Sequence, residues 1–267
     1  MDKVLIKDFS LLHTIECGQF FIYEFKENGF YEIINYSNKF FVKQDENYLY
    51  FENISEKDLK KFLGLDIDLN ILYDEDLDEY VKLALEKYWG MRIVQSELWQ
   101  TIISFVCSSA SNISKIKMNL RLIIENFSLD GTFPKFGELN DLEKLKFCKT
   151  GYRAKYIYEI NKMFLEDPTL YERILNSDYK TSKELLMSMP GVGSKVADCI
   201  CLFSLRHLEA FPVDTWIKQI IERLYLDKKT SLKEIEKYIE KKFNSKYKGI
   251  IQQYLFHYVR NNPEILK

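Results

Sequence analysis

The chain has 267 residues, of which 46% are apolar and 29% are charged, so it is long enough for about two domains and is neither disordered nor collagen-like. Its 38 basic and 40 acidic side chains give a formal net charge of −2, so overall basicity does not mark a nucleic-acid binder, although a near-neutral total can conceal a basic face. The start is not signal-like and no apolar run could span a bilayer, which favours a cytoplasmic protein without a membrane partner.

The first 55 residues or so have the pattern of β-strands. Aromatic and β-branched runs at 20–25, 30–36, 40–42 and 48–51 are separated by turn-forming residues, among them Asn28-Gly29. These runs predict three or four antiparallel strands joined by tight turns.

From Ser55 onward the apolar residues recur at intervals of three and four, which is typical of helices. Ser55 to Asp58 has the spacing of a capping box ahead of the first helix. Later helices are expected at 141–148, 153–165, 181–188, 194–205, 215–226, 231–243 and 249–259. The sequence therefore predicts an α+β protein, with a small antiparallel sheet domain at 1–72 and a larger helical body at 73–267.

The cysteines and histidines do not suggest metal binding. Five cysteines are scattered, without the pairs that a disulfide framework, a zinc ribbon or an iron–sulfur cluster would need. The three histidines, His13, His207 and His257, lack the spacing of metal ligands. We therefore expect no metal site.

The most informative segment is a helix–turn–helix at about 181–205. A helix should end before Pro190, the glycines Gly191 and Gly193 permit a tight turn, and a second helix should start at Ser194. Free amides in that helix's first turn would form a phosphate-binding corner that needs no lysine. The alternative is a plain helical corner with no ligand.

A lysine and a carboxylate are expected to converge beside this corner. Lys195 stands at the helix start, where the dipole disfavours a cation and favours the neutral, nucleophilic amine. Asp214 follows Pro212 and is a natural N-cap for a helix near Thr215. Such a pair predicts glycosidic-bond chemistry on DNA, whereas the alternative is a surface lysine and a simple helix cap.

These motifs resemble a known family. Pro190–Lys195 and Pro212–Asp214 resemble the helix-hairpin-helix/Gly-Pro-Asp DNA glycosylase superfamily, and Lys195–Leu202 is similar to eukaryote-type 8-oxoguanine DNA glycosylase/lyase. The resemblance extends over nearly the whole chain. It implies a base-excision repair enzyme that flips 8-oxoguanine out of duplex DNA, cleaves its N-glycosidic bond through a lysine Schiff base, and nicks the abasic site by β-elimination. It also implies a monomer that requires no cofactor, with a structural monovalent cation as an option at the hairpin.

The resemblance assigns catalytic roles to two residues and base recognition to four. Lys195 matches the nucleophile and Asp214 the carboxylate that stabilises positive charge on the sugar. Gly18 matches a glycine whose carbonyl accepts a hydrogen bond from N7–H, a proton that guanine lacks. The remaining base-recognition residues are Cys199 and Phe256, which pack on the two faces of the base, and Gln252, which reads its Watson–Crick edge. Without the resemblance, a small buried thiol, a core aromatic and a strand-start glycine are the alternatives.

Further residues match positions that hold DNA. Gly191, Val192 and Gly193 form the hairpin, Tyr152 matches a wedge inserted into the base stack, and Arg153 an arginine that faces the orphaned base. Asn112 and Lys115 belong to the segment that approaches the opposite strand.

This sequence departs from the family at three positions. Ala110 stands where the family has asparagine, and Lys115 where it has an arginine that reads the opposite cytosine. We therefore expect a relaxed preference for cytosine. Trp216 replaces a histidine that contacts a phosphate. Two readings compete with this one: a related glycosylase with another lesion preference, and a non-catalytic hairpin module that only holds DNA.

Overall fold

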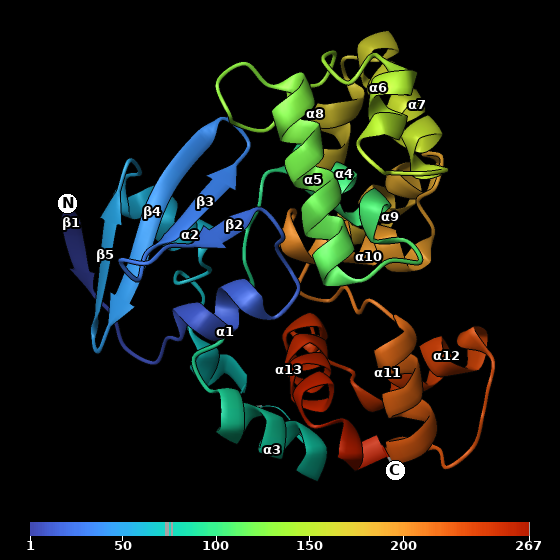
Figure 1. The fold of residues 1–267 in the computed structure, drawn as a ribbon. Coiled ribbons are helices and arrows are strands. Elements are labelled where there is room, and N and C mark those ends of the chain that lie inside the picture. Colours follow the sequence, from blue (N-terminus) through green and yellow to red (C-terminus); the bar gives the residue numbers. More distant parts are fainter. Residues whose placement is uncertain (73–74, 76, 267) are drawn as a thin grey trace.

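The computed structural model describes residues 1–72, 75 and 77–266 and begins with a five-stranded antiparallel sheet (Figure 1). The strands follow the order β1-β5-β4-β3-β2 across the sheet. Their bounds are β1 Asp2–Leu5, β2 Tyr23–Phe25, β3 Tyr31–Asn35, β4 Asn38–Asp45 and β5 Tyr48–Glu52. The predicted antiparallel sheet is confirmed, with one strand more than the largest number expected.

Strands β3 and β4 show how the sequence forms this sheet. They are joined by a two-residue turn in which Tyr36 has a φ of +57°, and Asn35 pairs with Asn38. Alternate side chains of β4, Phe40 and Val42, are buried while their neighbours are more exposed. This alternation places one face of the sheet on the hydrophobic core.

The N-terminal region also contains a helix that the sequence analysis missed. Residues Leu11–Glu16 form α1, where only strands were expected. Ser10 caps it by accepting a hydrogen bond from the His13 amide, and Leu11 and Ile15 are buried. A six-residue helix is too short to show a helical period, which explains the wrong prediction.

The body of the protein is helical, as predicted. Its helices are α2 Glu56–Phe62, α3 Glu79–Tyr88, α4 Leu98–Ser108, α5 Ile113–Phe127, α6 Leu142–Phe147, α7 Arg153–Glu166, α8 Leu170–Leu175, α9 Tyr179–Met187, α10 Ser194–Phe203, α11 Thr215–Ile220, α12 Leu232–Lys242 and α13 Lys248–Asn261. Helix α8 was not expected. The helix expected at 215–226 is α-helical only to Ile220 and continues as a π-helical turn, Ile221–Tyr225.

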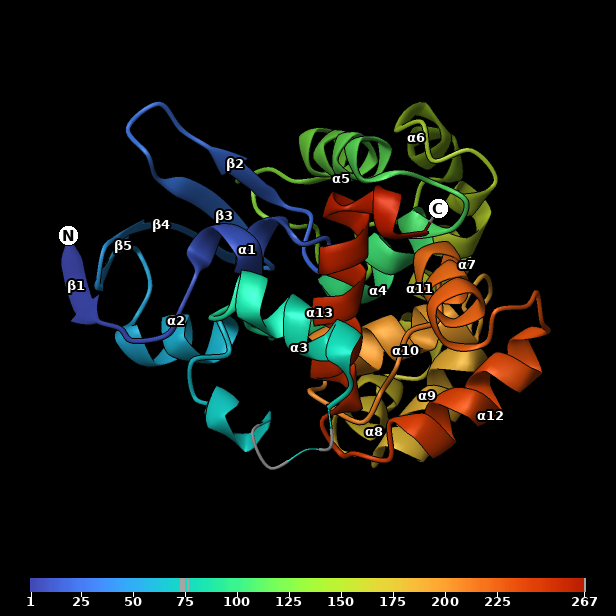
Figure 2. The same cartoon turned by 90° about the horizontal axis from the view of Figure 1, so that it is seen from below.

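Two helices organise the interior. Helix α4 is buried along almost its whole length and packs on α5, α7 and α10. Helix α13 packs on α3 and α11, and Figure 2 shows it near the middle of the molecule, with the sheet region on one side and the hairpin helices on the other. These two helices therefore connect the interior of the protein to the region between the sheet and the hairpin helices.

Hydrogen bonds join the sheet to the helical body. The Gln100 side chain accepts from the Tyr36 amide at 2.5 Å and donates to the Ile34 carbonyl at 2.9 Å. The Asn35 side chain accepts from the Ser96 hydroxyl and the Glu97 amide. The division expected at 72/73 falls beside residues 73 and 74, which lie outside the described residues, and it stays a prediction.

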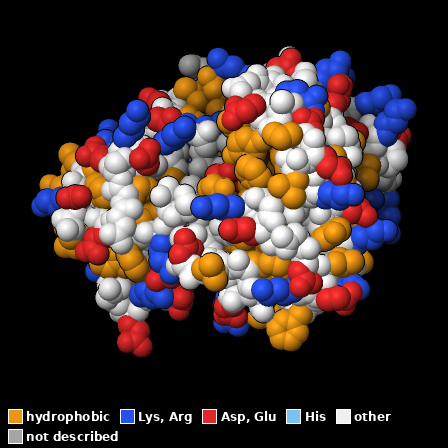
Figure 3. All heavy atoms as spheres, turned by 90° about the horizontal axis from the view of Figure 1, so that it is seen from above, with side chains coloured by type: hydrophobic (Ala, Val, Ile, Leu, Met, Phe, Trp, Pro, Cys, Tyr) orange, Lys and Arg blue, Asp and Glu red, His pale blue; other side chains and the backbone are white. Residues whose placement is uncertain are grey.

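The surface is mixed in charge. Figure 3 shows basic and acidic side chains interspersed over the face seen from above. Within the described ranges, no group of three His, Cys, Asp or Glu side chains could hold a metal ion, and all five cysteines are buried and free. None of the helices described is long and apolar enough to cross a membrane.

Candidate active site and DNA interface

The hairpin between α9 and α10 uses its two glycines differently. Gly191 has a φ of +78°, and a Cβ there would collide with the Tyr156 ring, so both conformation and space require glycine. Gly193 has an extended conformation and faces open space, and it precedes α10 without providing a side-chain cap. The first-turn amides of α10 are therefore free to meet a ligand.

Val192 has a different position from its two neighbours. Its side chain is buried, and its amide donates to the Met189 carbonyl at 3.2 Å. Val192 thus fixes the hairpin on the core.

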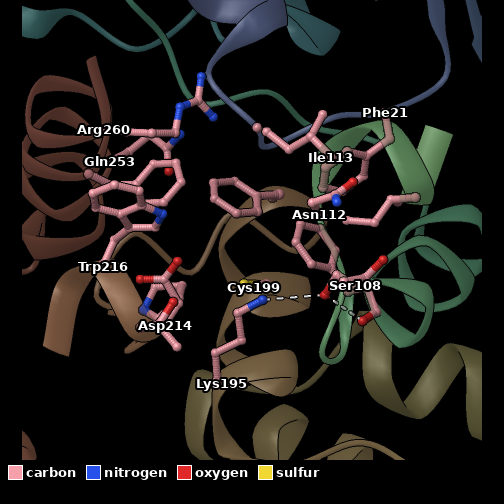
Figure 4. Close-up of a pocket in the computed structure, with 18 of the residues that line it drawn as sticks. Phe21, Ser108, Asn112, Ile113, Lys195, Cys199, Asp214, Trp216, Gln253 and Arg260 are labelled. Carbon is pink, nitrogen blue, oxygen red and sulfur yellow. Dashed lines mark hydrogen bonds between the residues drawn. The ribbon is translucent and has the colours of Figure 1, made fainter. Parts of the chain in front are cut away.

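A cavity of about 460 Å³ lies beside the hairpin and gathers residues from five distant segments (Figure 4). The residues predicted for the site that line it are Gly18, Asn112, Lys195, Cys199, Asp214, Gln252 and Phe256. A second cavity, of about 550 Å³, contains Gly191, Gly193, Lys195 and Asp214. The two cavities therefore meet at the predicted catalytic pair.

Lys195 projects from the first turn of α10 into the first cavity (Figure 4). Its Nζ lies 3.3 Å from the Ser108 Oγ and 5.5 Å from the centroid of the Phe105 ring. The Ser108 hydroxyl donates its proton to the Phe105 carbonyl at 2.7 Å, so it serves Lys195 as an acceptor. No carboxylate of the described residues forms an ion pair with Lys195, and its side chain lines the cavity.

Asp214 is the N-cap of α11, as the sequence predicted. Its Oδ1 accepts a hydrogen bond from the Ile217 amide at 2.8 Å, which fixes the carboxylate at the cavity wall. Burial raises the pKa of Asp214, and hydrogen bonds from the Ile217 and Trp216 amides, together with the nearby charge of Lys195, oppose that rise. The carboxylate is thus held without a direct cationic partner, in a position to respond to positive charge that develops in the cavity.

Cys199 and Gln252 contribute a thiol and an unused acceptor. Burial raises the pKa of the Cys199 thiol to about 12, so it is a neutral wall of the cavity. Gln252 is 3% exposed; its Nε2 donates to the Pro212 carbonyl at 3.2 Å, while its Oε1 has no partner among the described residues. A buried acceptor that lines a cavity without a partner is suited to bind a ligand donor.

Gly18 closes the opposite side of the cavity. Its φ is +92°, and a Cβ would lie 2.9 Å from the Arg260 Nη1 and 3.3 Å from the Ile113 Cδ1. The neighbouring Cys17 carbonyl accepts hydrogen bonds from the side chains of Gln253 and Arg260. The site thus needs glycine here, because any side chain would displace the wall.

Sequence reasoning missed several residues of this cavity. Phe105, Ser108, Gln253 and Arg260 line it and were not predicted. The spacing of Arg260, four residues after Phe256, could have indicated it, because residues i and i+4 share a helix face. For Ser108 and Phe105, the sequence contains no comparable spacing to a predicted site residue on the same helix. Trp216, noted only as a departure, also lines the cavity, so its indole contributes to the wall.

Tyr152 is the N-cap of α7 and Arg153 is the first residue of that helix, and the two differ in exposure. Tyr152 is 55% exposed, and its hydroxyl donates to the Ser109 carbonyl at 3.3 Å. Arg153 is 3% exposed, and its guanidinium donates to the carbonyls of Ser109, Ala110 and Thr150. Carbonyls of the protein thus occupy the donors of Arg153 in this structure, and a position of Arg153 facing an orphaned base stays a prediction.

Asn112 and Lys115 lie at the start of α5. The Asn112 side chain caps this helix by accepting from the Lys115 amide at 2.9 Å, and both residues are exposed. Ala110 precedes them with a φ of +48° and presents only a methyl group. The DNA-binding roles of Asn112 and Lys115 stay predictions.

Comparison with known proteins defines the class to which this fold and site belong. Residues 103–245 match the model of the HhH-GPD superfamily of base excision DNA repair proteins. Residues 3–102 match the N-terminal domain of 8-oxoguanine DNA glycosylase. The chain belongs to the 8-oxoguanine DNA glycosylase family of this superfamily.

Solved structures support the assignment over the whole chain. MBOgg1 in complex with a low-affinity DNA ligand is 31% identical, with a TM-score of 0.91 over 98% of this chain and 96% of that one. The Clostridium acetobutylicum 8-oxoguanine glycosylase/lyase, bound to double-stranded DNA with cytosine opposite 8-oxoguanine, is 29% identical, with a TM-score of 0.88 over 98% and 99%.

A curated relative is similar over a shorter region. The N-glycosylase/DNA lyase of Saccharomyces cerevisiae is 36% identical over 193 residues, which are 62% of this chain. The matched region spans only 50% of the yeast protein.

Proposed function

We propose that this protein is a bifunctional DNA N-glycosylase/AP lyase that removes 8-oxoguanine from duplex DNA. The observation that carries this proposal is the meeting of Lys195 and Asp214 at the junction of two cavities, one beside the phosphate-binding hairpin and one enclosed by Gly18, Cys199 and Phe256. A nucleotide flipped out of the duplex would place its base in the enclosed cavity and its sugar at the catalytic pair.

The enclosed cavity offers complementary groups for an oxidised purine. The Cys199 thiol and the Phe256 ring would pack on the two faces of the base, and the free Gln252 Oε1 would accept from its Watson–Crick edge. The Gly18 carbonyl would accept from N7–H of 8-oxoguanine. Guanine has an acceptor at N7, so two acceptors would face each other unpaired, which disfavours the undamaged base.

The chemistry would begin with attack by the neutral Lys195 amine on the sugar C1′. An N–C1′ bond forms, the C1′–N9 bond breaks, and its electron pair leaves with the purine, which takes up a proton. Asp214 stabilises the positive charge that develops on the sugar. The lysine nitrogen, after losing a proton, forms a C1′=N bond with its lone pair as the C1′–O4′ bond breaks and O4′ takes up a proton. The resulting Schiff base allows loss of a C2′ proton and cleavage of the C3′–O bond, which nicks the strand.

The DNA backbone would be held mainly by the main chain. Free amides at the start of α10 and open space at Gly193 would accept a phosphate, and the exposed Tyr152 would act as a wedge in the base stack. The turn Pro190–Gly193 contains no acidic side chain, so a monovalent cation there would bind main-chain carbonyls. The steps at Lys195 and Asp214 do not require that ion.

Borohydride trapping tests the proposal directly. We expect the wild type to form a covalent complex with a duplex that contains one 8-oxoguanine, and not with undamaged duplex. Lys195→Gln should abolish the complex, whereas Lys155→Gln, at an exposed residue paired with Glu159, should leave it intact. Base release without trapping would instead support water attack led by Asp214. Neither release nor trapping would favour the DNA-binding module or a glycosylase with another lesion preference.

A further inference from the structure

Arg260 on α13 connects two walls of the base cavity. Its Nη1 donates to the Cys17 carbonyl at 3.2 Å, and its Nη2 donates to the Glu16 carbonyl at 3.0 Å. These carbonyls lie at the C-terminal end of α1, where a cation is favourable. Arg260 therefore ties the segment that leads into Gly18 to the helix that carries Phe256.

The guanidinium of Arg260 donates to both of these main-chain carbonyls. It forms no ion pair with a carboxylate of the described residues, and its side chain is half-buried. Gln253, two turns earlier on the same helix, also donates to the Cys17 carbonyl, at 3.3 Å. Two side chains of α13 thus donate to the same carbonyl of this loop. Fixing them in place costs side-chain conformational entropy, which a solvent-exposed arginine would retain.

The same guanidinium also contacts the Phe256 ring and lies beside Gly18. Its Cζ lies 5.3 Å from the centroid of the Phe256 ring, within the range of a cation–π contact. Its Nη1 lies 2.9 Å from the point that a Cβ on Gly18 would occupy. In Figure 4, Arg260 stands at the edge of the cavity beside the N-terminal loop, opposite Lys195. One side chain therefore sets the spacing between the Gly18 backbone and the Phe256 ring.

We propose that Arg260 is a positioning residue for lesion selectivity. It holds the Gly18 carbonyl at hydrogen-bonding distance from N7–H of a base that is stacked on Phe256. Because hydrogen bonds weaken steeply with distance and angle, a loop released from Arg260 would lose this contact before it lost stacking or catalysis. The inference rests on the proposed function and adds a residue that discriminates the lesion.

The test compares a reaction that uses the base cavity with one that does not. For each protein, the single-turnover rate of base release from an 8-oxoguanine duplex is divided by the nicking rate of a preformed abasic duplex. The variants are Arg260→Met, which keeps an apolar stem against Phe256, and Arg260→Lys, which keeps the charge but not the two-pronged donor. The control is Arg206→Met, because Arg206 also donates to a main-chain carbonyl, that of Lys61, away from the cavity.

We expect the ratio to fall about tenfold in Arg260→Met, and by less in Arg260→Lys, while Arg206→Met stays within about twofold of the wild type. The binding preference for 8-oxoguanine duplex over guanine duplex should fall in parallel. Equal losses in both reactions, or an unchanged ratio, would overturn the proposal and leave Arg260 a structural residue. If Arg260→Met does not fold, the ratio for Arg260→Lys decides alone. Failure of the proposed function would be distinct, because the wild type itself would not release the base.

Discussion

At the scale of the residue, the site contains polar side chains that lack the ion pair or hydrogen bond they would usually form. The charge of Lys195 acts on Asp214 although the two form no ion pair, and the Gln252 Oε1 is buried without a partner among the described residues. Each arrangement costs stability, because buried polar groups normally find partners. The cost is understandable if a flipped nucleotide supplies the missing contacts.

Asp214 should set the acid limb of the pH profile. Burial raises its pKa above the ordinary value of 3.8, so the carboxylate becomes protonated, and loses its effect on the sugar, at a higher pH than an exposed aspartate. We expect Asp214→Asn to slow base release by about 10²-fold or more and to remove this limb. Single-turnover rates would be measured from about pH 3 to 8, which covers the ordinary carboxylate pKa of about 4 and higher values.

The matched control is Asp178→Asn. Asp178 caps α9 through the Thr181 amide at 2.8 Å, as Asp214 caps α11, but it lies outside the two cavities that contain Lys195. Its substitution should preserve the profile. An acid limb that survives in Asp214→Asn would contradict the prediction.

His257 should make stability depend on pH. Burial, with the charges of Arg260 and His13, lowers its pKa from 6.5 to about 3. The unfolded chain therefore binds this proton first, and the stability that neutral His257 provides is lost as the pH falls from about 6.5 toward 3. We expect His257→Gln to flatten the pH dependence of the free energy of unfolding over this range, by about 1.4 kcal/mol per pH unit at most. Urea unfolding at several pH values would measure both slopes, and identical slopes would refute the prediction.

At the scale of the element, a buried ion pair joins the two hairpin helices. The Lys183 Nζ of α9 lies 2.8 Å from the Asp198 Oδ1 of α10, and the Tyr179 hydroxyl donates to the same carboxylate at 2.6 Å. Burial raises the pKa of Asp198, and these two partners oppose the rise. The network therefore links the two helices that flank the turn Pro190–Gly193.

Removal of one partner should therefore be costly. We expect Lys183→Met to lower the free energy of unfolding by about 3 kcal/mol, because it leaves a buried carboxylate without its cation. Lys155→Met removes an exposed pair with Glu159 at 3.7 Å and should change stability by less than about 1 kcal/mol. Urea denaturation gives both values, and similar losses in the two variants would show that the network contributes little.

The loop between α4 and α5 should determine the response to the opposite base. Ala110 presents only a methyl group, and Lys115 lacks the planar guanidinium with which an arginine could form two parallel hydrogen bonds to a base. The guanidinium of Arg153 donates to carbonyls of the loop itself. We expect excision rates opposite the four bases to lie within about tenfold of one another. The double substitution Ala110→Asn with Lys115→Arg should increase the preference for cytosine. A strong cytosine preference in the wild type, measured with a base panel, would refute this expectation.

At the scale of the whole molecule, the sheet and the helical body share one hydrogen-bonded core. Gln100 and Asn35 connect them, and Arg260 binds the loop after α1. We therefore expect one cooperative unfolding transition, with coincident curves from circular dichroism and tryptophan fluorescence. Gln100→Ala should shift both curves together. Two separate transitions would show that the regions 1–72 and 73–267 fold independently.

Elements with long sequence patterns were predictable, and elements with short ones were not. The long helices and the hairpin were predictable, because apolar spacing, Pro190 and the glycines act locally. Helix α1 was not, because six residues do not establish a period. The contacts of Arg153 were not predictable, because its partners include carbonyls of a distant loop that no local pattern reveals.

The sequence by itself determined which functional groups this protein can use, since a lysine at a helix start, a capping aspartate and a glycine hairpin are local features of the chain. Only the tertiary structure decided how they are combined. It brought Gly18, Lys195 and Gln252 to one cavity and placed Arg260 between two of its walls. The physical reason is that caps and turns depend on neighbours in the chain, whereas a cavity depends on packing between segments that are distant in the sequence.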